Sequence, residues 1–313
     1  MAVTMEVDRG IPEEAGDRAA AELILPLPGG EALPGYDRGW LFAGGPQPYL
    51  SYVETDPSVN WSDDLEALHE ESSRTHFLDR WTRSAIVERV GDVAPGGVIA
   101  DVGCSTGYLL EDLIAAYPRV SLIGVDLVPG GLEKAHARSP SVRLLRADVG
   151  ALPIADGVLD AVVSANLLEH VPDDLRALRE FARVLAPGGR AVIVVPAGPA
   201  TYDYYDRFLG HERRYEQGEL AAKCAEAGLE PIEDLHIASL LYPAFWLVKQ
   251  RNRRRHWALH GDALERRVAA DIGRTHESHA GALAWRIEEL MVRAGVRLPF
   301  GIRSLVLARR PPA

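Results

Sequence analysis

The chain has 313 residues, of which 47% are apolar and 25% are charged, as is usual for a soluble globular protein. Its formal net charge of −11 disfavours nucleic acid as a partner, because phosphates attract Lys and Arg. The two cysteines, Cys104 and Cys224, lie far apart and have no histidines at metal-ligand spacing. We therefore predict neither a disulfide framework nor a metal site.

The N-terminal stretch, residues 1–17, is acidic and has no apolar core, so it is not expected to act as a signal peptide. The longest apolar run, residues 238–248, is too short to span a bilayer and contains Pro243. We predict a cytoplasmic protein without a membrane span.

The first part of the chain, residues 1–84, is predicted to form a cap or lid region. Residues 1 to about 60 are rich in Pro and Gly and carry scattered aromatic residues without periodicity, which fits either a mobile tail or a cap. From Asp63 to Val90 the apolar spacing is helical, and Ser62 is a suitable N-cap.

The middle of the chain alternates between strand and helix patterns. Short apolar runs predict strands at 98–103, 121–126, 142–148, 158–166 and 190–196. Helical spacing between them predicts helices at 106–117, 131–139 and 173–185. This alternation indicates an α/β fold, a mostly parallel sheet with helices on both faces, and the nearly all-apolar strands fit burial on both sides.

The C-terminal part adds two more strands, which makes a seven-stranded sheet. A helix is predicted at 217–227, a strand at 230–237, a mostly helical insert at about 239–299, and a last strand at 303–310 that returns to the sheet. The arginine cluster between Arg251 and Arg255 is interpreted as a solvated helix face.

Acidic residues end three successive predicted strands. The first strand and its turn read VIADVGCSTG, with Asp101 at the strand end and Gly103 and Gly107 bracketing the turn. Glycine there allows positive φ and close approach of a ligand to the backbone. Asp126 ends the next strand, where a carboxylate can hold two ribose hydroxyls, and Asp148 ends the third. The pattern predicts a nucleoside site at the carboxyl edge of the sheet.

A nicotinamide dehydrogenase is the main alternative for this fold. Its fingerprint is G-x-G-x-x-G, with a pyrophosphate at the helix N-terminus, whereas this turn has only Gly103 and Gly107. Asp101 would repel a pyrophosphate but suits a cationic amino-acid ligand. These features indicate S-adenosyl-L-methionine.

The stretch DVGCSTG resembles the D-x-G-x-G-x-G motif of class I S-adenosylmethionine-dependent methyltransferases, with Ser105 in place of the middle glycine. The resemblance continues through 124–126, 146–171 and 183–196, and covers about 86–237. It implies a Rossmann-like class I methyltransferase fold for 85–313, and S-adenosyl-L-methionine as the methyl donor, which leaves as S-adenosyl-L-homocysteine.

The resemblance also implies roles for individual residues. Gly103 and Gly107 face the methionine part, Asp126 the ribose, and Asp148 with Val149 the adenine. The full set of implied donor-binding residues is Asp101, Gly103, Ser105, Gly107, Asp126, Leu127, Asp148, Val149, Asn166 and Arg83.

Two members of this set have their own arguments. Asn166 is expected beside the sulfonium. Arg83 lies in a segment, 69–86, similar to an E-S-x-x-x-F-W-x-x-R segment of one bacterial subgroup. It is predicted to approach the donor's carboxylate, with a surface ion pair as the alternative.

The densely charged stretch YDYYDRFLGHERRY, residues 202–215, is similar to the D-x-x-x-G-H-x-R-R-Y segment of the same subgroup. Because it follows the strand at 190–196, we expect it to lie over the methyl donor rather than to form a plain surface loop. His211 is the predicted base, since histidine titrates near neutrality. The other predicted catalytic residues are Asp206, Tyr205 and Tyr202, and His170 is the second candidate for the base. Arg213 and Arg214 are expected to pair with local carboxylates such as Asp203 or Glu212.

The predicted function is methyl transfer to a small molecule, a specialised metabolite with a hydroxyl or aromatic-carbon acceptor such as a phenol or an indole. A sugar- or lipid-linked substrate and a catalytically silent donor-binding module are the alternatives. A nucleic-acid methyltransferase would carry N/D-P-P-Y/F after the fourth strand, where this chain reads SANLLEH.

Overall fold

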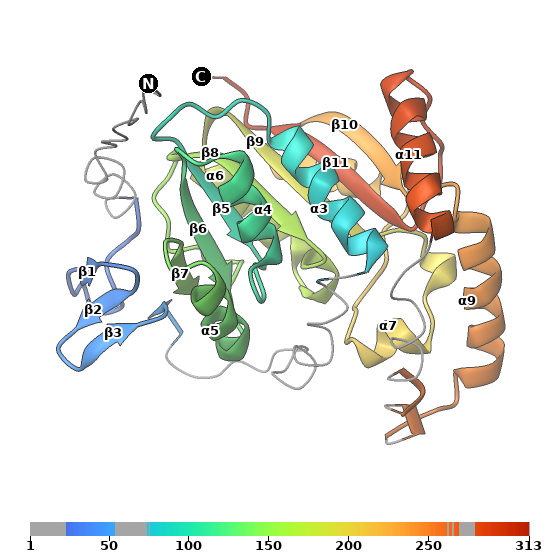
Figure 1. Ribbon diagram of the computed structural model, residues 1–313, viewed down its shortest axis with the longest axis horizontal. Coiled ribbons are helices and arrows are strands. Elements are labelled where there is room, and N and C mark those ends of the chain that lie inside the picture. The colour runs from blue at the N-terminus through green and yellow to red at the C-terminus, as the bar shows by residue number, and fades with distance from the viewer. Residues whose placement is uncertain are drawn as a thin grey trace, which may run out of the picture.

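The computed structural model describes residues 23–53, 74, 76–261, 263–264, 266–268 and 279–312. Its centre is an eight-stranded sheet with the strand order β10-β11-β9-β8-β5-β6-β7-β4 (Figure 1). The strands are β4 (Leu50–Ser51), β5 (Val98–Val102), β6 (Ser121–Asp126), β7 (Arg143–Arg146), β8 (Leu159–Ala165), β9 (Leu185–Pro196), β10 (Glu230–Ile237) and β11 (Arg303–Arg309).

The sheet is mostly parallel, as predicted, since only the two pairings of β11, with β10 and with β9, are antiparallel among these strands. It has one strand more than the predicted seven. The eighth, β4, pairs Leu50 with Leu145 of β7. A strand of two residues is too short to show a period of two, which explains why the N-terminal sequence gave no sign of it.

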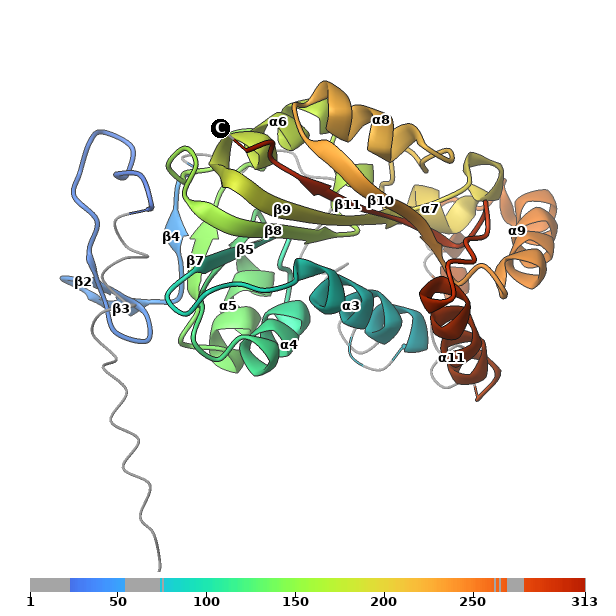
Figure 2. The ribbon, with the colours of Figure 1, turned by 90° about the horizontal axis from the view of Figure 1, so that it is seen from above.

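Helices cover both faces of the sheet (Figure 2). One face carries α3 (Phe77–Val90), α4 (Tyr108–Ala116) and α5 (Pro129–Arg138), and the other carries α6 (Asp174–Val184) and α8 (Glu219–Glu226). Each layer buries its own apolar cluster against the sheet. Parallel strands sandwiched in this way leave their carboxyl ends as the accessible edge for a ligand.

The described part of the N-terminal region packs along the β7 edge (Figure 1). Its strands β1 (Gly35–Tyr36), β2 (Trp40–Phe42) and β3 (Gly45–Gln47) form a small antiparallel sheet. Trp40 is fully buried, and its Nε1 donates to the carbonyl of Leu144 at 3.1 Å. Of the helix predicted from Asp63, α3 begins at Phe77, and residues 54–73 lie outside the described residues. The lid prediction therefore stays a prediction for that part.

The insert after β10 contains two long helices, α9 (Tyr242–His256) and α11 (His279–Arg293). The arginines of the cluster, Arg251 and Arg253 to Arg255, are exposed on α9. Within the described ranges, every helix is too short or too polar to cross a bilayer.

Candidate functional site

The direction of the chain changes between β5 and β8. From β5 it proceeds outward to β6 and β7, and from β8 it proceeds the other way to β9. The turns that leave β5 and β8 therefore diverge, and the crevice at such a switch point is where open α/β sheets bind ligands. Most of the predicted donor residues lie at the ends of β5, β6 and β7, with Asn166 directly after β8 and Arg83 on α3, whereas His170 and His211 follow β8 and β9.

The turn after β5 is held by unusual backbone conformations. Gly103, Ser105 and Gly107 all have positive φ, of 83°, 47° and 86°. A Cβ on Gly103 would lie 3.0 Å from the Cβ of Leu167, which follows β8. Glycine is required here because the two diverging turns touch. Ser105 takes the left-handed conformation that the middle glycine of the motif would take at no cost.

Asp126 holds this turn in place through both carboxylate oxygens. Oδ2 accepts the backbone N–H of Ser105 at 2.8 Å, and Oδ1 accepts that of Val128 at 2.9 Å. Burial raises the pKa of Asp126, although these hydrogen bonds oppose the shift. A carboxylate can accept about four hydrogen bonds, and three backbone N–H groups, those of Ser105, Leu127 and Val128, already donate to Asp126, so capacity is left for a ribose hydroxyl.

Asp101 is a buried carboxyl that has no counter-charge among the described residues. It is 1% exposed, and its Oδ2 accepts no hydrogen bond from any described residue. Burial and the charge of Asp126 raise the pKa of Asp101 to about 8. A buried carboxylate is costly unless a cation or hydrogen-bond donors accompany it. The ammonium of the donor's methionine is such a cation, so these residues fit S-adenosyl-L-methionine.

The remaining predicted donor residues lie along the same edge. Asp148 is exposed and its Oδ1 accepts the N–H of Gly150 at 2.7 Å, while Val149 is buried. The carbonyl of Leu127 accepts a hydrogen bond from Arg146. Their contacts with adenine stay predictions.

Two other predicted donor residues have clear local roles. Asn166 ends β8 with a φ of 53°, a conformation that asparagine tolerates. Arg83 pairs with Asp112 of α4 at 2.7 Å, which is the ion pair weighed as its alternative role. Its approach to the donor's carboxylate stays a prediction.

The stretch 202–215 lies over the carboxyl ends of β8 and β9. It begins with the short helix α7 (Tyr204–Phe208), in which Asp203 and Asp206 form a capping box. The N–H of Glu212 donates to the carbonyl of Glu169 at 2.8 Å, and that of Tyr215 donates to Pro196 at 3.0 Å. These bonds fix the stretch against the turn after β8, which touches Gly103.

His211 and Asp206 form a buried pair. Nδ1 of His211 lies 3.0 Å from Oδ1 of Asp206, and the two side chains are 8% and 0% exposed. Burial alone would raise the pKa of Asp206, but the hydrogen bond from His211 and two neighbouring cations hold it well below its usual range. An ionised carboxylate only accepts, so Nδ1 carries a proton, and in neutral His211 Nε2 carries the lone pair.

Two further cations stabilise this carboxylate. Nε of Arg214 lies 2.6 Å from Oδ1 of Asp206. Nζ of Lys249, on α9, lies 3.2 Å from its Oδ2 and 2.8 Å from Asp203. The sequence did not predict Lys249 as part of this site. It is 43 residues from Asp206 in sequence, and the sequence of its helix is typical of a solvent-exposed helix.

Arg213 was expected, like Arg214, to pair with a carboxylate in its own segment such as Asp203 or Glu212. It instead pairs with Asp174 at the start of α6, at 3.0 Å, because the chain after β9 folds back over α6.

The two predicted catalytic tyrosines contact the same segment. The hydroxyl of Tyr202 donates to the carbonyl of His211 at 2.7 Å. The ring of Tyr205 lies 5.5 Å from the ammonium of Lys249, and burial raises the pKa of its hydroxyl. Both contacts hold the loop around His211, and a direct part in catalysis stays a prediction.

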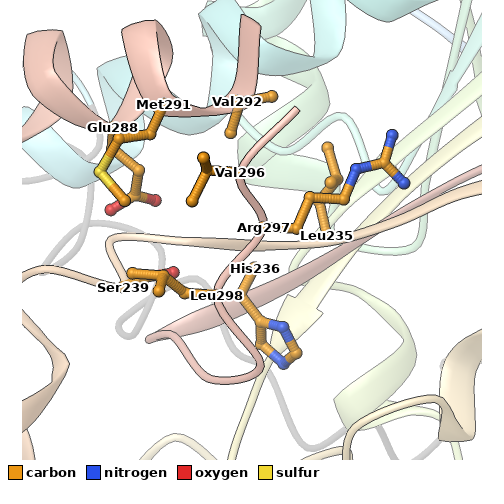
Figure 3. A pocket seen from close by; sticks show the side chains of 9 residues that line it. All are labelled: Leu235, His236, Ser239, Glu288, Met291, Val292, Val296, Arg297 and Leu298. Carbon is orange, nitrogen blue, oxygen red and sulfur yellow. The ribbon is translucent and has the colours of Figure 1, made fainter. Parts of the chain in front are cut away.

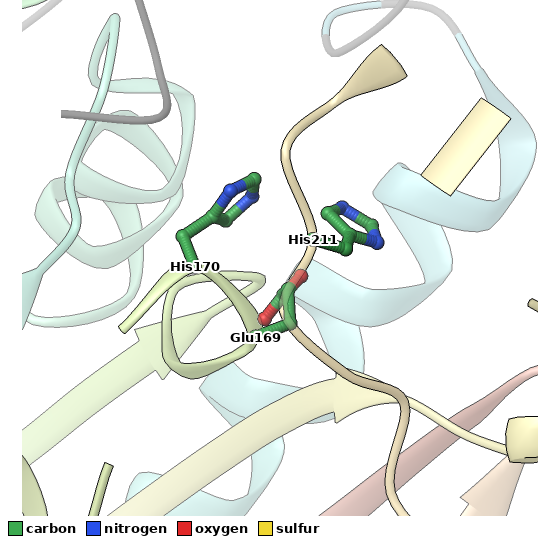
Figure 4. Close-up of side chains that lie close together, drawn as sticks. All are labelled: Glu169, His170 and His211. Carbon is green, nitrogen blue, oxygen red and sulfur yellow. The ribbon is translucent and has the colours of Figure 1, made fainter. Parts of the chain in front are cut away.

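Glu169 and His170 complete the surroundings of His211 (Figure 4). Both belong to η1 (Leu168–His170), the single turn after β8. The rings of His170 and His211 meet edge to face, with their centroids 4.7 Å apart. Glu169 is 1% exposed. Sequence reasoning had singled out His170 but not Glu169, whose burial depends on the segment that covers it.

A small pocket elsewhere, between β10 and α11, contains none of the predicted site residues (Figure 3). The buried Glu288 at its side accepts the N–H of Leu240 at 3.1 Å. This carboxylate caps the turn after β10, so we assign the pocket no role.

Comparison with known proteins finds similarity in the part of the chain that forms the carboxyl edge of the sheet. Residues 100–193, from β5 to β9, match the family model described as a methyltransferase domain. The matched residues include the turn after β5 from Gly103 to Gly107, as well as Asp126, Asp148 and η1. This region of the chain is similar to class I S-adenosylmethionine-dependent methyltransferases.

Curated methyltransferases match the same region. Demethylmenaquinone methyltransferase of Thermus thermophilus is 40% identical over 119 residues, which are 37% of this chain and 53% of that protein. Trans-aconitate 2-methyltransferase of Methylobacterium nodulans is 36% identical over 122 residues, 38% of this chain and 46% of that protein. The chain thus spans about half the length of these relatives.

A solved methyltransferase shares the fold. Phosphoethanolamine N-methyltransferase 2 of Haemonchus contortus, in complex with S-adenosyl-L-methionine, is 14% identical with a TM-score of 0.54. The alignment covers 81% of this chain and 58% of that one. The methyltransferase family uses this donor, and the buried Asp101 and the capacity of Asp126 are what fit it here.

Proposed function

We propose that this protein transfers the methyl group of S-adenosyl-L-methionine to a small-molecule acceptor. The observation that carries the proposal is the place of the His211–Asp206 pair. The segment that carries it is hydrogen-bonded to the turn after β8, and Leu167 of that turn lies against Gly103, which follows β5 and Asp101. A group on the acceptor at this position faces the donor from the opposite side of the crevice.

The proposed acceptor group is a hydroxyl or an activated aromatic carbon, as in a phenol or an indole, of a specialised metabolite. Both acceptors lose a proton during transfer, and a positioned base accelerates such a step by roughly 10²- to 10⁴-fold. Nε2 of His211 is the group we propose acts on this proton. The acceptor's bond to the methyl carbon forms as the carbon–sulfur bond breaks, and the sulfonium charge is lost.

The relatives support the small-molecule class without deciding the acceptor. Their names describe methylation of demethylmenaquinone, of trans-aconitate and of a malonyl group on an acyl-carrier protein.

The test is a screen of phenols, indoles and hydroxylated metabolites with S-adenosyl-L-methionine, read by mass spectrometry as the gain of one methyl group. With an acceptor in hand, His211→Ala is expected to lower turnover about 10²-fold or more with donor affinity little changed. Full activity of His211→Ala would exclude it as the acting residue. Donor binding without turnover on any acceptor class would favour a silent binding module.

A further inference from the structure

The three side chains Glu169, His170 and His211 form a cluster of possible metal ligands (Figure 4). Each offers one ligand atom, a carboxylate oxygen or a ring nitrogen, and these atoms all lie within 4.8 Å of one another. Two of the residues are neighbours in η1, and His211 comes from the segment that closes over it. No spacing rule would find this set, because the third ligand is 41 residues further along a chain that must first form β9.

Glu169 supplies an independent reason to expect a cation here. It is 1% exposed, and neither of its carboxylate oxygens has a hydrogen-bond partner among the described residues. A buried carboxylate left in this state is destabilising unless it is protonated or paired with a cation. The nearby arginines are engaged elsewhere, Arg214 with Asp206 and Arg303 with Asp79.

The pair behind His211 resembles the support that metal-binding histidines receive. A histidine ligand almost always donates its other ring N–H to a carboxylate or carbonyl, which fixes its tautomer and raises its basicity. Nδ1 of His211 donates to the ionised Asp206 at 3.0 Å, so Nε2 is the nitrogen left to bind. Asp206 is itself fixed by Arg214 and Lys249.

We propose that Glu169, His170 and His211 bind a divalent transition-metal ion. Two histidines and one glutamate are a common protein set for catalytic zinc, and two histidines with a carboxylate also hold ferrous iron. Both leave coordination positions open for a ligand. The expectation of no metal site, drawn from cysteine and histidine spacing, is revised by this proposal.

A metal site here adds to the proposed function, and its catalytic role rests on the proposed methyl transfer. An ion at this place, beside the donor edge, holds an oxygen of the acceptor and lowers the pKa of its hydroxyl. His211 then acts on the acceptor through the ion instead of as a free base. This favours acceptors that present an oxygen, such as a phenol or a hydroxy acid, over bare aromatic carbon.

The experiment uses the full chain without a histidine tag, freed of metal by a chelator. Zn²⁺ binding is measured by calorimetry, and Co²⁺ binding by its visible absorption, which reports coordination by nitrogen and oxygen. We expect one ion per chain. Glu169→Gln, His170→Gln and His211→Gln should each weaken binding at least tenfold, and His260→Gln, at an exposed histidine, should not.

Thermal unfolding and S-adenosyl-L-methionine binding are measured on every variant to confirm that it is folded. If His211→Gln fails to fold because Asp206 loses its partner, the two variants in η1 still decide the matter. Saturable binding that weakens in Glu169→Gln and His170→Gln supports the site. Absence of stoichiometric binding, or binding that no variant weakens, overturns it. A protein that binds the donor but no ion refutes this inference alone, whereas one that binds an ion but no donor refutes the proposed function.

Discussion

At the scale of single residues, the turn after β5, from Gly103 to Gly107, contains backbone strain. Four described non-glycine residues have positive φ, and two of them, Ser105 and Asn166, lie at the ends of β5 and β8. A left-handed conformation costs an ordinary residue roughly 1–2 kcal/mol, and such costs persist where the surrounding structure holds them, commonly at functional sites. The crevice between β5 and β8 is therefore held in shape partly at the expense of stability.

Ser105→Gly is expected to relieve that strain. The free energy of unfolding should rise by about 0.5–1 kcal/mol, because glycine takes positive φ freely while losing more entropy on folding. Ser105→Ala keeps the strain and should bring no gain. Denaturant unfolding compares the three proteins, and equal stabilities of the Gly and Ala variants would contradict the account.

Asp126→Ala is expected to weaken S-adenosyl-L-methionine binding by more than tenfold, ~1.4 kcal/mol. The variant loses the proposed ribose contacts and also the anchor of the Ser105 N–H. Calorimetry measures the affinity, and Asp92→Ala, at an exposed aspartate, is the matched control. Unchanged affinity of Asp126→Ala would remove it from the donor site.

Asp101 predicts a pH dependence of stability. Its folded-state pKa of about 8 lies above the usual value of roughly 3.9, so the fold favours the protonated form. The protonated carboxyl contributes its full stabilisation of the fold below the pKa of the unfolded state. This contribution is lost as the pH rises through the folded-state pKa of Asp101. Asp101→Asn should therefore stabilise the donor-free protein increasingly between pH ~4 and ~8. Thermal unfolding across this range checks it, and a difference independent of pH would refute the raised pKa.

At the scale of elements, the segment after β9 is joined to α9 by buried charges. Asp203 and Asp206 of the capping box share the ammonium of Lys249, and all three side chains are at least nine-tenths buried. The segment that positions His211 thus depends on a helix distant in sequence.

Lys249→Met keeps the length of the side chain and removes its charge. It should cost about 3–5 kcal/mol of stability, because breaking a buried pair leaves uncompensated carboxylates. Lys134→Met on α5, outside this cluster, is the control. A stability loss in Lys249→Met no larger than in the control, measured by denaturant unfolding, would show that the carboxylates need no lysine.

At the scale of the whole molecule, the described part of the N-terminal region, residues 23–53, is built into the domain. Trp40 belongs to the same core cluster as α6 and the sheet, and β4 extends that sheet at its β7 edge. Its aromatic residues Tyr36 and Trp40 pack on each other, with ring centroids 5.1 Å apart. This packing gives the two rings a structural role that is separate from stacking on a substrate.

Trp40→Ala should accordingly destabilise the whole domain by about 3–5 kcal/mol, the usual cost of removing a buried aromatic side chain. Donor affinity of the folded fraction should change little. Phe42→Ala, at a side chain that is 41% exposed, should cost far less. Loss of activity in Trp40→Ala without loss of stability would return this segment to the role of a lid.

The sequence alone determined the class of the fold, the alternation of strands and helices, and the acids that end β5, β6 and β7. These are local signals, because periodicity, glycine turns and the residues at strand ends each depend only on residues that are close together in the sequence. It also indicated that the segment 202–215 crosses the site. It could not reveal β4, whose two residues show no pattern, the pairing of Arg213 with Asp174, or the pairing of Asp206 with Lys249. Above all, only the tertiary structure brought Glu169 and His170 to His211 and buried them together. Such convergence depends on which segments the sheet topology places side by side, and on the desolvation that follows.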